Sequence, residues 1–174
     1  PGSVNALAEH WAEKFKKTLK NVRRSTFAQA VRETVADFER IPLGRMDKPK
    51  VGIVGEILLK YHPAANNQLT DLIEAQGGEV APTDIVDFFL YCAHGNIASR
   101  ELLHGGWRAA AVAKTAIAYV EWLRDDVRKA LAKSARYAPP GRFMHLARHG
   151  QNITGHGQCA GEGWLLTAEM AEFL

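Results

Sequence analysis

The hydrophobic and polar positions between residues 50 and 92 fall into blocks that predict a complete βαβ unit. A short β-branched run at 51–54 ends at Gly55, and such a run before a glycine favours a buried parallel strand. A second short strand is predicted at 80–81 and is closed by Pro82. In a βαβ unit the two strands lie parallel and are joined by a right-handed crossover.

The crossover between these strands begins with a polar stretch, 56–63, which is interpreted as a loop. Apolar residues at helical spacing predict a helix at 69–75, with Asn66 or Asn67 as its cap. The pair at 77–78, two glycines, suits the left-handed conformation at a helix C-terminus. Functional side chains are expected in the loops beyond the carboxyl ends of the strands, at 55–63 and after Pro82.

Two amphipathic helices are predicted upstream of the βαβ unit. The first covers 4–22, and the second starts at a capping box formed by Thr26 and Gln29. Residues 1–3 are interpreted as the remnant of a cleaved expression tag. The helical lead-in, 4–48, is expected to pack against the sheet.

Downstream of Cys92 the sequence predicts a turn at 93–96, a helix resuming at Ser99, and a long helix at 108–134. The charged residues of the long helix are interpreted as a solvated face, with Asp125 and Lys129 as a supporting pair. Its apolar stripe, expected to face the core, consists of Val112, Ala116, Val120, Leu123, Val127 and Leu131.

The last part of the chain contains two helical turns at 142–149, a glycine-rich loop at 151–163 and a final helix at 164–174. A parallel sheet whose last helix leads to no further strand suggests a piece cut from a longer protein. The pattern predicts one helix-rich α/β domain over 4–174. We expect a Rossmann-like or flavodoxin-like three-layer arrangement around a short parallel sheet.

The composition, with 47% hydrophobic and 24% charged residues and a net charge of +3, is typical of a soluble globular chain. No apolar run is long enough for a membrane span and the N-terminus has no signal-peptide core, so a cytoplasmic location is expected. The basic residues are spread out and offset by 19 acids, which argues against nucleic-acid binding. Two cysteines do not make a disulfide framework.

The first candidate site is the loop after the first strand, which contains Glu56, Tyr61 and His62. A carboxylate, a phenol and an imidazole near a helix N-terminus suit anion binding or proton transfer. The alternative is that Glu56 caps backbone amides while the two rings pack. The chain has neither a dinucleotide-binding glycine motif nor a P-loop.

The second candidate is a set of histidines in the last third of the chain. His145 and His149 are four residues apart on one helix face, and His156 lies three residues before Cys159. Both spacings are found in zinc sites. However, Arg148 lies between the first two histidines and is unfavourable beside a divalent cation.

The third candidate is Cys159, in the glycine-rich loop just before the final helix. A helix N-terminus lowers a thiol pKa, and backbone amides there can approach the sulfurs of an iron–sulfur cluster. A lone packed cysteine is the alternative, because one thiol cannot hold a cluster. Cys92 is a second candidate, although the apolar DFFLY run before it argues for burial.

Four phrases of the chain, KPKVGIVGEILLKYHPAANN, DLIEAQGGEV, DFFLYC and GEGWLLTAEM, resemble a module of proteins related to 2-hydroxyacyl-CoA dehydratases and their activases. The resemblance extends from about Lys50 to the end. It implies a Rossmann-like or flavodoxin-like domain in which cysteines hold [4Fe–4S] or double-cubane clusters. In that family an ATP-hydrolysing activase supplies a low-potential electron, and the dehydratase removes water from a 2-hydroxyacyl-CoA through a ketyl radical.

The resemblance implies that Cys159 is the position most like a cluster ligand, followed by Cys92, with Glu56 and Tyr61 lining the same cleft. The chain departs from the family because it lacks a full set of cysteine ligands and the ATP-binding motif of the activase. The expected role is therefore one lobe of a cluster-bearing, electron-accepting component, inactive and without a cofactor when alone. The alternative is a non-catalytic module that docks an activase to its partner.

Overall fold

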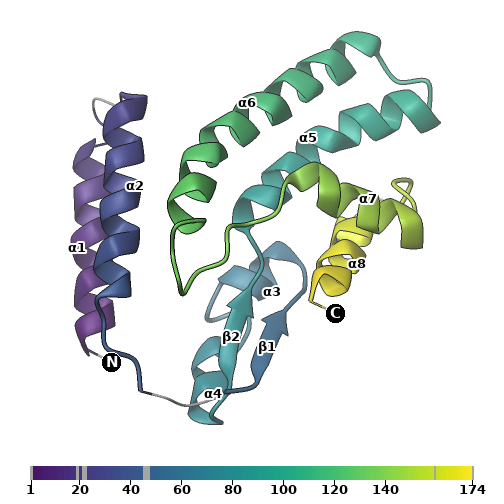
Figure 1. The fold of residues 1–174 in the computed structure, drawn as a ribbon. Coiled ribbons are helices and arrows are strands. Elements are labelled where there is room, and N and C mark those ends of the chain that lie inside the picture. Colours follow the sequence, from purple (N-terminus) through teal and green to yellow (C-terminus); the bar gives the residue numbers. More distant parts are fainter. Residues whose placement is uncertain (1, 19, 21–22, 45–47, 159, 174) are drawn as a thin grey trace. The chain divides into compact units, whose positions relative to one another are not determined.

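The computed structural model describes residues 2–18, 20, 23–44, 48–158 and 160–173 (Figure 1). Contacts divide the chain into two compact units. Unit 1 comprises Pro1–Arg45 and Val120–Pro140, and unit 2 comprises Met46–Tyr119 and Gly141–Leu174. The long helix α6 (Trp107–Leu131) contributes its first half to unit 2 and its second half to unit 1.

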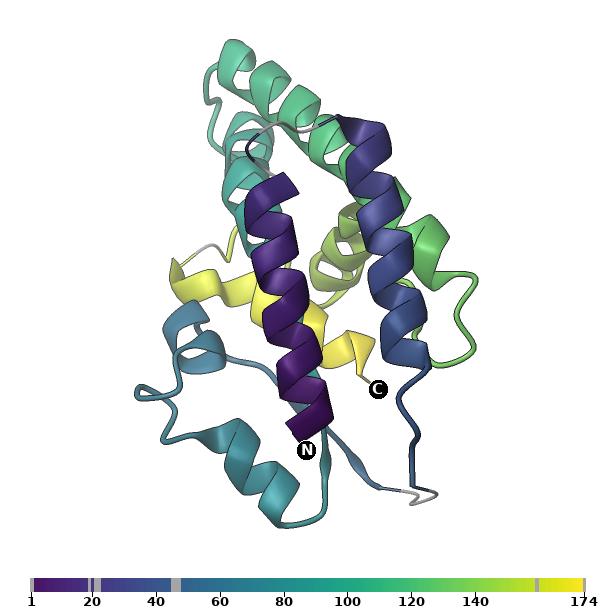
Figure 2. The ribbon, with the colours of Figure 1, turned by 90° about the vertical axis from the view of Figure 1, so that its left-hand side faces the viewer.

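In unit 1, α1 (Gly2–Thr18) and α2 (Arg24–Glu39) form an antiparallel hairpin, which Figure 2 shows from a second side. The Trp11 side chain is buried between them, and its Nε1 donates a hydrogen bond to Asp37 Oδ2 (3.2 Å). An aromatic ring on one helix that bonds a carboxylate on the other fixes how the two helices align. Both predicted lead-in helices are therefore present.

The start of α2 differs from the prediction, because the helix begins at Arg24 and Thr26 lies inside it. Arg23 occupies the N-cap position without a side-chain hydrogen bond, so the predicted capping box is wrong. The reason is tertiary. Arg24 Nε donates to Asp126 Oδ2 (2.7 Å), and its guanidinium stacks 3.5 Å from the Trp122 ring centre, which holds this turn in the helix.

The predicted solvated face of the long helix is only partly right: Lys129 and Lys133 are exposed, but other charged side chains of α6 in unit 1 are buried. Glu121 and Arg124 are each 7% exposed, and Arg124 Nη1 donates to Glu121 Oε1 (3.0 Å). Arg128 Nη2 also donates to Glu121 Oε2 (2.6 Å), and its Nη1 donates to Asp125 (3.1 Å). Arginine forks can satisfy a buried carboxylate, which lets these charges lie inside.

The predicted apolar stripe of α6 is wrong in the half that belongs to unit 2. Val112 is 69% exposed, whereas Ala110, Ala113 and Ile117 are buried. The buried face of this half therefore consists of two alanines and an isoleucine, and alanines let a neighbouring element approach closely.

Unit 2 contains a two-stranded parallel sheet, formed by β1 (Lys50–Ile53) and β2 (Glu79–Pro82) with Val51 opposite Val80. Because helices make up most of the described residues around it, the predicted helix-rich, mixed α/β class is confirmed. The predicted burial of β1 is wrong, since Ile53 is buried but Val51 is 37% exposed. A pair of strands has few neighbours to cover both of its faces.

The crossover helix α4 (Leu69–Ala75) covers the predicted residues, but its N-cap position is occupied by Gln68, with φ 56°, rather than by Asn66 or Asn67. Asn66 Oδ1 accepts a hydrogen bond from the first amide of the helix (3.2 Å). Gly77 has φ 86°, and the Gly78 amide donates to the Ile73 carbonyl (3.0 Å). This is the Schellman arrangement, in which a left-handed glycine closes the last turn.

Two predicted loops are helical. The stretch 56–63 contains α3 (Ile57–Tyr61), and the predicted turn at 93–96 lies inside the unbroken helix α5 (Ile85–Leu102). His94 is 2% exposed within this segment. The sequence favours a turn there because glycine and asparagine are weak helix formers, but burial of the helix outweighs about 1 kcal/mol of local propensity.

The core of unit 2 lies where α7 (Phe143–Ile153) packs on α8 (Gly163–Glu172), as Figure 1 shows. Phe143, Trp164 and Leu165 are all completely buried. A short 3₁₀ turn, η2 (Ala160–Glu162), precedes α8. The predicted glycine-rich loop at 151–163 is therefore helical at both of its ends.

A close approach at Gly150 makes this packing testable. A Cβ atom at Gly150 would lie 2.7 Å from Trp164 Cε3 and 2.9 Å from the Trp164 carbonyl oxygen. We expect Gly150→Ala to lower the free energy of unfolding by about 1–3 kcal/mol, because two helix backbones must move apart.

Gly95→Ala is the matched control in α5. A Cβ atom there meets nothing within 4 Å, so a gain of about 0.5–1 kcal/mol is expected. Urea unfolding of both variants checks this, and equal effects would contradict it.

Candidate functional site

The carboxyl ends of β1 and β2 meet at one edge of the sheet, and two predicted site residues lie there. Glu56 is the N-cap of α3, and its Oε2 accepts a hydrogen bond from the Leu58 amide (2.9 Å). The Tyr61 hydroxyl donates to the Thr83 carbonyl (2.8 Å) just after β2, and burial raises the Tyr61 pKa. Glu56 thus follows the alternative reading as a capping residue, while Tyr61 ties α3 to the end of β2.

A cluster of three buried charges lies behind this edge. The buried charge cluster consists of Lys60 on α3, Glu162 at the end of η2 and Glu169 on α8. Lys60 Nζ donates to both oxygens of Glu169, at 2.8 and 3.0 Å, and both side chains are 2% exposed. Glu162 Oε2 lies 3.9 Å from Lys60 Nζ, too far for a hydrogen bond. One cation therefore faces two carboxylates in a dry environment.

The surroundings of the cluster favour the protonated form of Glu169. Burial raises the pKa of Glu169, Lys60 opposes this rise, and the negative charge of Glu162 adds to it. Two carboxylates beside one ammonium group carry an excess negative charge that low-dielectric surroundings disfavour. Glu169 is therefore the carboxyl group of the cluster whose charge depends most on the ammonium group of Lys60.

The glycine-rich turn is fastened to α3 by Glu162. Its Oε1 accepts a hydrogen bond from the Ile57 amide (2.9 Å), across 105 residues of sequence. Glu162 has φ 64° and Gly161 has φ 60°, so a non-glycine residue is held in the left-handed region. That conformation costs about 1–2 kcal/mol, which the hydrogen bond and the ionic contact offset. The turn is thus placed at the carboxyl edge of β1.

A cluster of aromatic rings lies under the same turn and includes His94, His156 and Trp164. The His94 ring is 4.5 Å from His156 and 5.4 Å from Trp164, measured between ring centres. His156 Nε2 lies 2.7 Å from the Ala147 carbonyl. Burial, and secondarily His156, lowers the pKa of His94 to about 4, so its imidazole is neutral at physiological pH. Within the described residues, His94 Nδ1 and Trp164 Nε1 have no hydrogen-bond partner.

Of the two candidate cysteines, Cys159 lies outside the described residues. Cys92 is exposed on α5, so the burial suggested by the DFFLY run does not apply to it. Partial desolvation and, after it, Glu162 raise the Cys92 pKa.

The predicted zinc histidines are not joined by further ligands. His145 and His149 are both exposed on α7, and His156 packs in the aromatic cluster. No group of three or more His, Cys, Asp or Glu side chains suited to a metal ion is found among the described residues. Two histidines alone fall short of the four ligands usual for structural zinc.

Sequence reasoning missed the buried charge cluster. Glu169 follows Leu165 by four residues and so lies on the apolar face of α8, which is one available signal. Lys60 gives no comparable local signal, because it lies in a stretch read as a polar loop. The partner of each charge is more than 100 residues away in sequence, which local patterns do not reveal.

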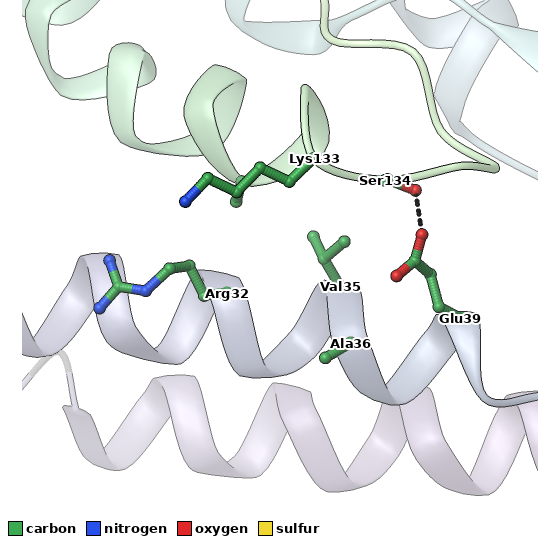
Figure 3. Close-up of a pocket in the computed structure, with 7 residues that line it drawn as sticks. Arg32, Val35, Ala36, Glu39, Lys133 and Ser134 are labelled. Carbon is green, nitrogen blue, oxygen red and sulfur yellow. Dashed lines mark hydrogen bonds between the residues drawn. The ribbon is translucent and has the colours of Figure 1, made fainter.

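A second candidate region is a cavity in unit 1, shown in Figure 3. This α2–α6 cavity has a volume of about 150 Å³. Its lining comes from α2 and from the end of α6, and consists of Arg32, Val35, Ala36, Glu39, Ala130, Lys133 and Ser134. None of these residues is among the site residues predicted from the sequence.

In the parts of the chain that the structure describes, no helix is long and apolar enough to cross a membrane. Comparisons with models of protein families, with curated proteins and with solved structures found no match to this chain.

Proposed function

We propose that this chain is part of an iron–sulfur, activase-dependent system of the 2-hydroxyacyl-CoA dehydratase type, in which it helps to hold a cluster and accept low-potential electrons. One observation carries the proposal: Glu162 of the glycine-rich turn bonds the Ile57 amide just beyond the carboxyl end of β1. Loops at that edge of a parallel sheet are where α/β proteins bind cofactors. The proposal includes a Rossmann-like or flavodoxin-like three-layer domain built around the short parallel sheet.

The described residues alone do not fit an iron–sulfur cluster. They supply one thiol, Cys92, and its pKa is raised rather than lowered. A cluster needs several thiolates. We therefore assign Cys159 as the candidate ligand on the resemblance of the GEGW phrase, with further cysteines from the full-length protein. What this chain itself contributes is the placement of the turn, through Glu162 and the buried charge cluster.

Anaerobic reconstitution of the full-length protein tests the assignment. We expect broad absorption near about 400 nm and bound iron, both reduced in Cys159→Ser. Cys92→Ser is the matched control, because it removes the exposed thiol with the raised pKa, and it should keep its iron content. Unchanged iron in Cys159→Ser would refute the ligand assignment, and absence of iron from the full-length protein would refute the function.

The alternative function is a non-catalytic α/β module that docks an ATP-hydrolysing activase. Exposed apolar side chains in unit 2 favour it: Leu58 is 59%, Leu59 52% and Phe89 61% exposed. Large exposed apolar groups often mark protein contacts. If Phe89→Ser weakens activase binding while reconstituted protein contains no iron, the docking function replaces the redox function.

A further inference from the structure

The α2–α6 cavity lies between two clamps that hold its walls together. At one end Arg24 bonds Asp126 and stacks on Trp122. At the other end Glu39 Oε1 accepts hydrogen bonds from Ser134 Oγ (2.6 Å) and the Ala135 amide (2.9 Å). The walls are therefore fixed at both ends, and the space between them is partly open to solvent.

Small side chains create the space. Ala36 on α2 and Ala130 on α6 lie where longer residues would fill the gap between the helices, and Ala130 is only 5% exposed. Well-packed interiors leave few voids larger than a water molecule. A cavity of about 150 Å³ between two clamped helices thus has room for several heavy atoms.

The cavity is polar at its two ends and aliphatic in the middle, as Figure 3 shows. The side chains of Arg32 and Lys133 extend to one end, Val35 and Ala36 lie in the middle, and Glu39 lies at the other end. Within the described part of the chain, neither Arg32 nor Lys133 makes an ion pair. Glu39 is already bonded, and the Ser134 hydrogen bond lowers its pKa. Two positive charges on exposed side chains therefore lie at this end of the cavity, and Glu33 is a further charge that interacts with Arg32.

We propose that the α2–α6 cavity binds a short-chain aliphatic carboxylate, with the carboxylate group between Arg32 and Lys133 and the hydrocarbon on Val35, Ala36 and Ala130. A guanidinium fork matches the two oxygens of a carboxylate, and Lys133 adds a second positive charge. A cavity of this volume accommodates about six heavy atoms, the size of butyrate. The site uses residues of unit 1 alone and is independent of the proposed redox function.

Titration of the ¹⁵N-labelled chain by NMR with butyrate, inorganic phosphate and butylamine tests the site. Butyrate should bind saturably with a Kd of about 1 mM, and the shifts should centre on the cavity residues. Phosphate lacks the hydrocarbon and should bind at least about tenfold more weakly. Butylamine has the same size but a positive charge and should cause no saturable shift.

Three variants locate the binding. Arg32→Gln with Lys133→Gln removes both cations, and Ala130→Leu fills the cavity, so each should raise the butyrate Kd at least about tenfold. Arg23→Gln with Lys17→Gln is the matched control, since it removes two exposed charges of the same unit away from the cavity. It should leave the Kd within about twofold. Should Ala130→Leu fail to fold, judged by circular dichroism, Ala36→Val takes its place.

Three results would overturn the proposal. The absence of saturable butyrate binding would identify the cavity as a packing gap, and a stabilising Ala130→Leu substitution would agree with that. Equal affinity for phosphate and butyrate would reduce the site to a surface charge effect. An equal loss of binding in the Arg23→Gln, Lys17→Gln control would show dependence on net charge rather than on the cavity.

Discussion

Replacing Lys60 by methionine is expected to lower the free energy of unfolding by about 3–5 kcal/mol, because Glu169 is left buried without its cation. Lys60 Nζ is the group that bonds both oxygens of Glu169, and Glu162 adds a second negative charge 3.9 Å away. Methionine keeps most of the length of the lysine side chain. Loss of packing therefore contributes little, and urea unfolding at neutral pH measures the electrostatic effect.

Two control variants distinguish the cost of leaving Glu169 buried without a cation from the cost of losing the ionic contact itself. The double variant Lys60→Met, Glu169→Leu removes both members of the pair, and we expect it to recover part of the stability, because an apolar pair can replace a buried ion pair while Glu162 still lacks its cation. Lys16→Met breaks the exposed ion pair with Glu13 on α1 and should cost less than about 1 kcal/mol. A double variant as unstable as Lys60→Met would show that the ionic contact itself is required.

Acidification should destabilise the protein through His94. The imidazole has a pKa of about 4 in the folded chain, against about 6.5 when unfolded. Its contribution to stability is therefore fully present above pH 6.5 and is lost as the pH falls towards 4, since protons bind the unfolded chain first. Between pH 7.5 and pH 5 we expect a loss of about 2 kcal/mol from this one group.

The His94→Phe variant isolates this effect from that of the carboxyl groups. Phenylalanine fits the aromatic surroundings of Phe143 and Trp164 and does not titrate. The variant should lose about 2 kcal/mol less than the native chain between the two pH values, measured by urea unfolding. His149→Gln, at an exposed position on α7, should keep the native pH dependence. Parallel pH profiles of native chain and His94→Phe would contradict the assignment.

The elements that the sequence predicts correctly are those whose signals are local. Gly77 and Gly78 end α4 because the left-handed turn needs a residue without a side chain at that point. The short strands β1 and β2 pair in parallel because a helix connects them. The edge where Glu56 and Tyr61 lie follows from that topology, so this part of the site was predictable.

The errors arise where distant contacts decide between similar local patterns. Helix α6 carries two apolar stripes, one through Val112 and one through Ala110, Ala113 and Ile117, and the packing partner selects the second. Likewise, nothing near Lys60 in sequence indicates that it is buried. Its partner, Glu169, lies on α8. The position of α8 is set by the packing of its apolar face, which the sequence around Lys60 does not reveal.

The division of α6 between the two units has a consequence for the order in which the chain folds during synthesis. Each unit is built from two separate stretches, so neither can be completed when its first stretch leaves the ribosome. Unit 1 cannot be completed until residues 120–140 have been synthesised, and unit 2 cannot be completed until α8 has been synthesised. The nascent chain therefore exposes the side of α2 that contacts residues 120–140 until late in translation, a period in which chaperones can bind it.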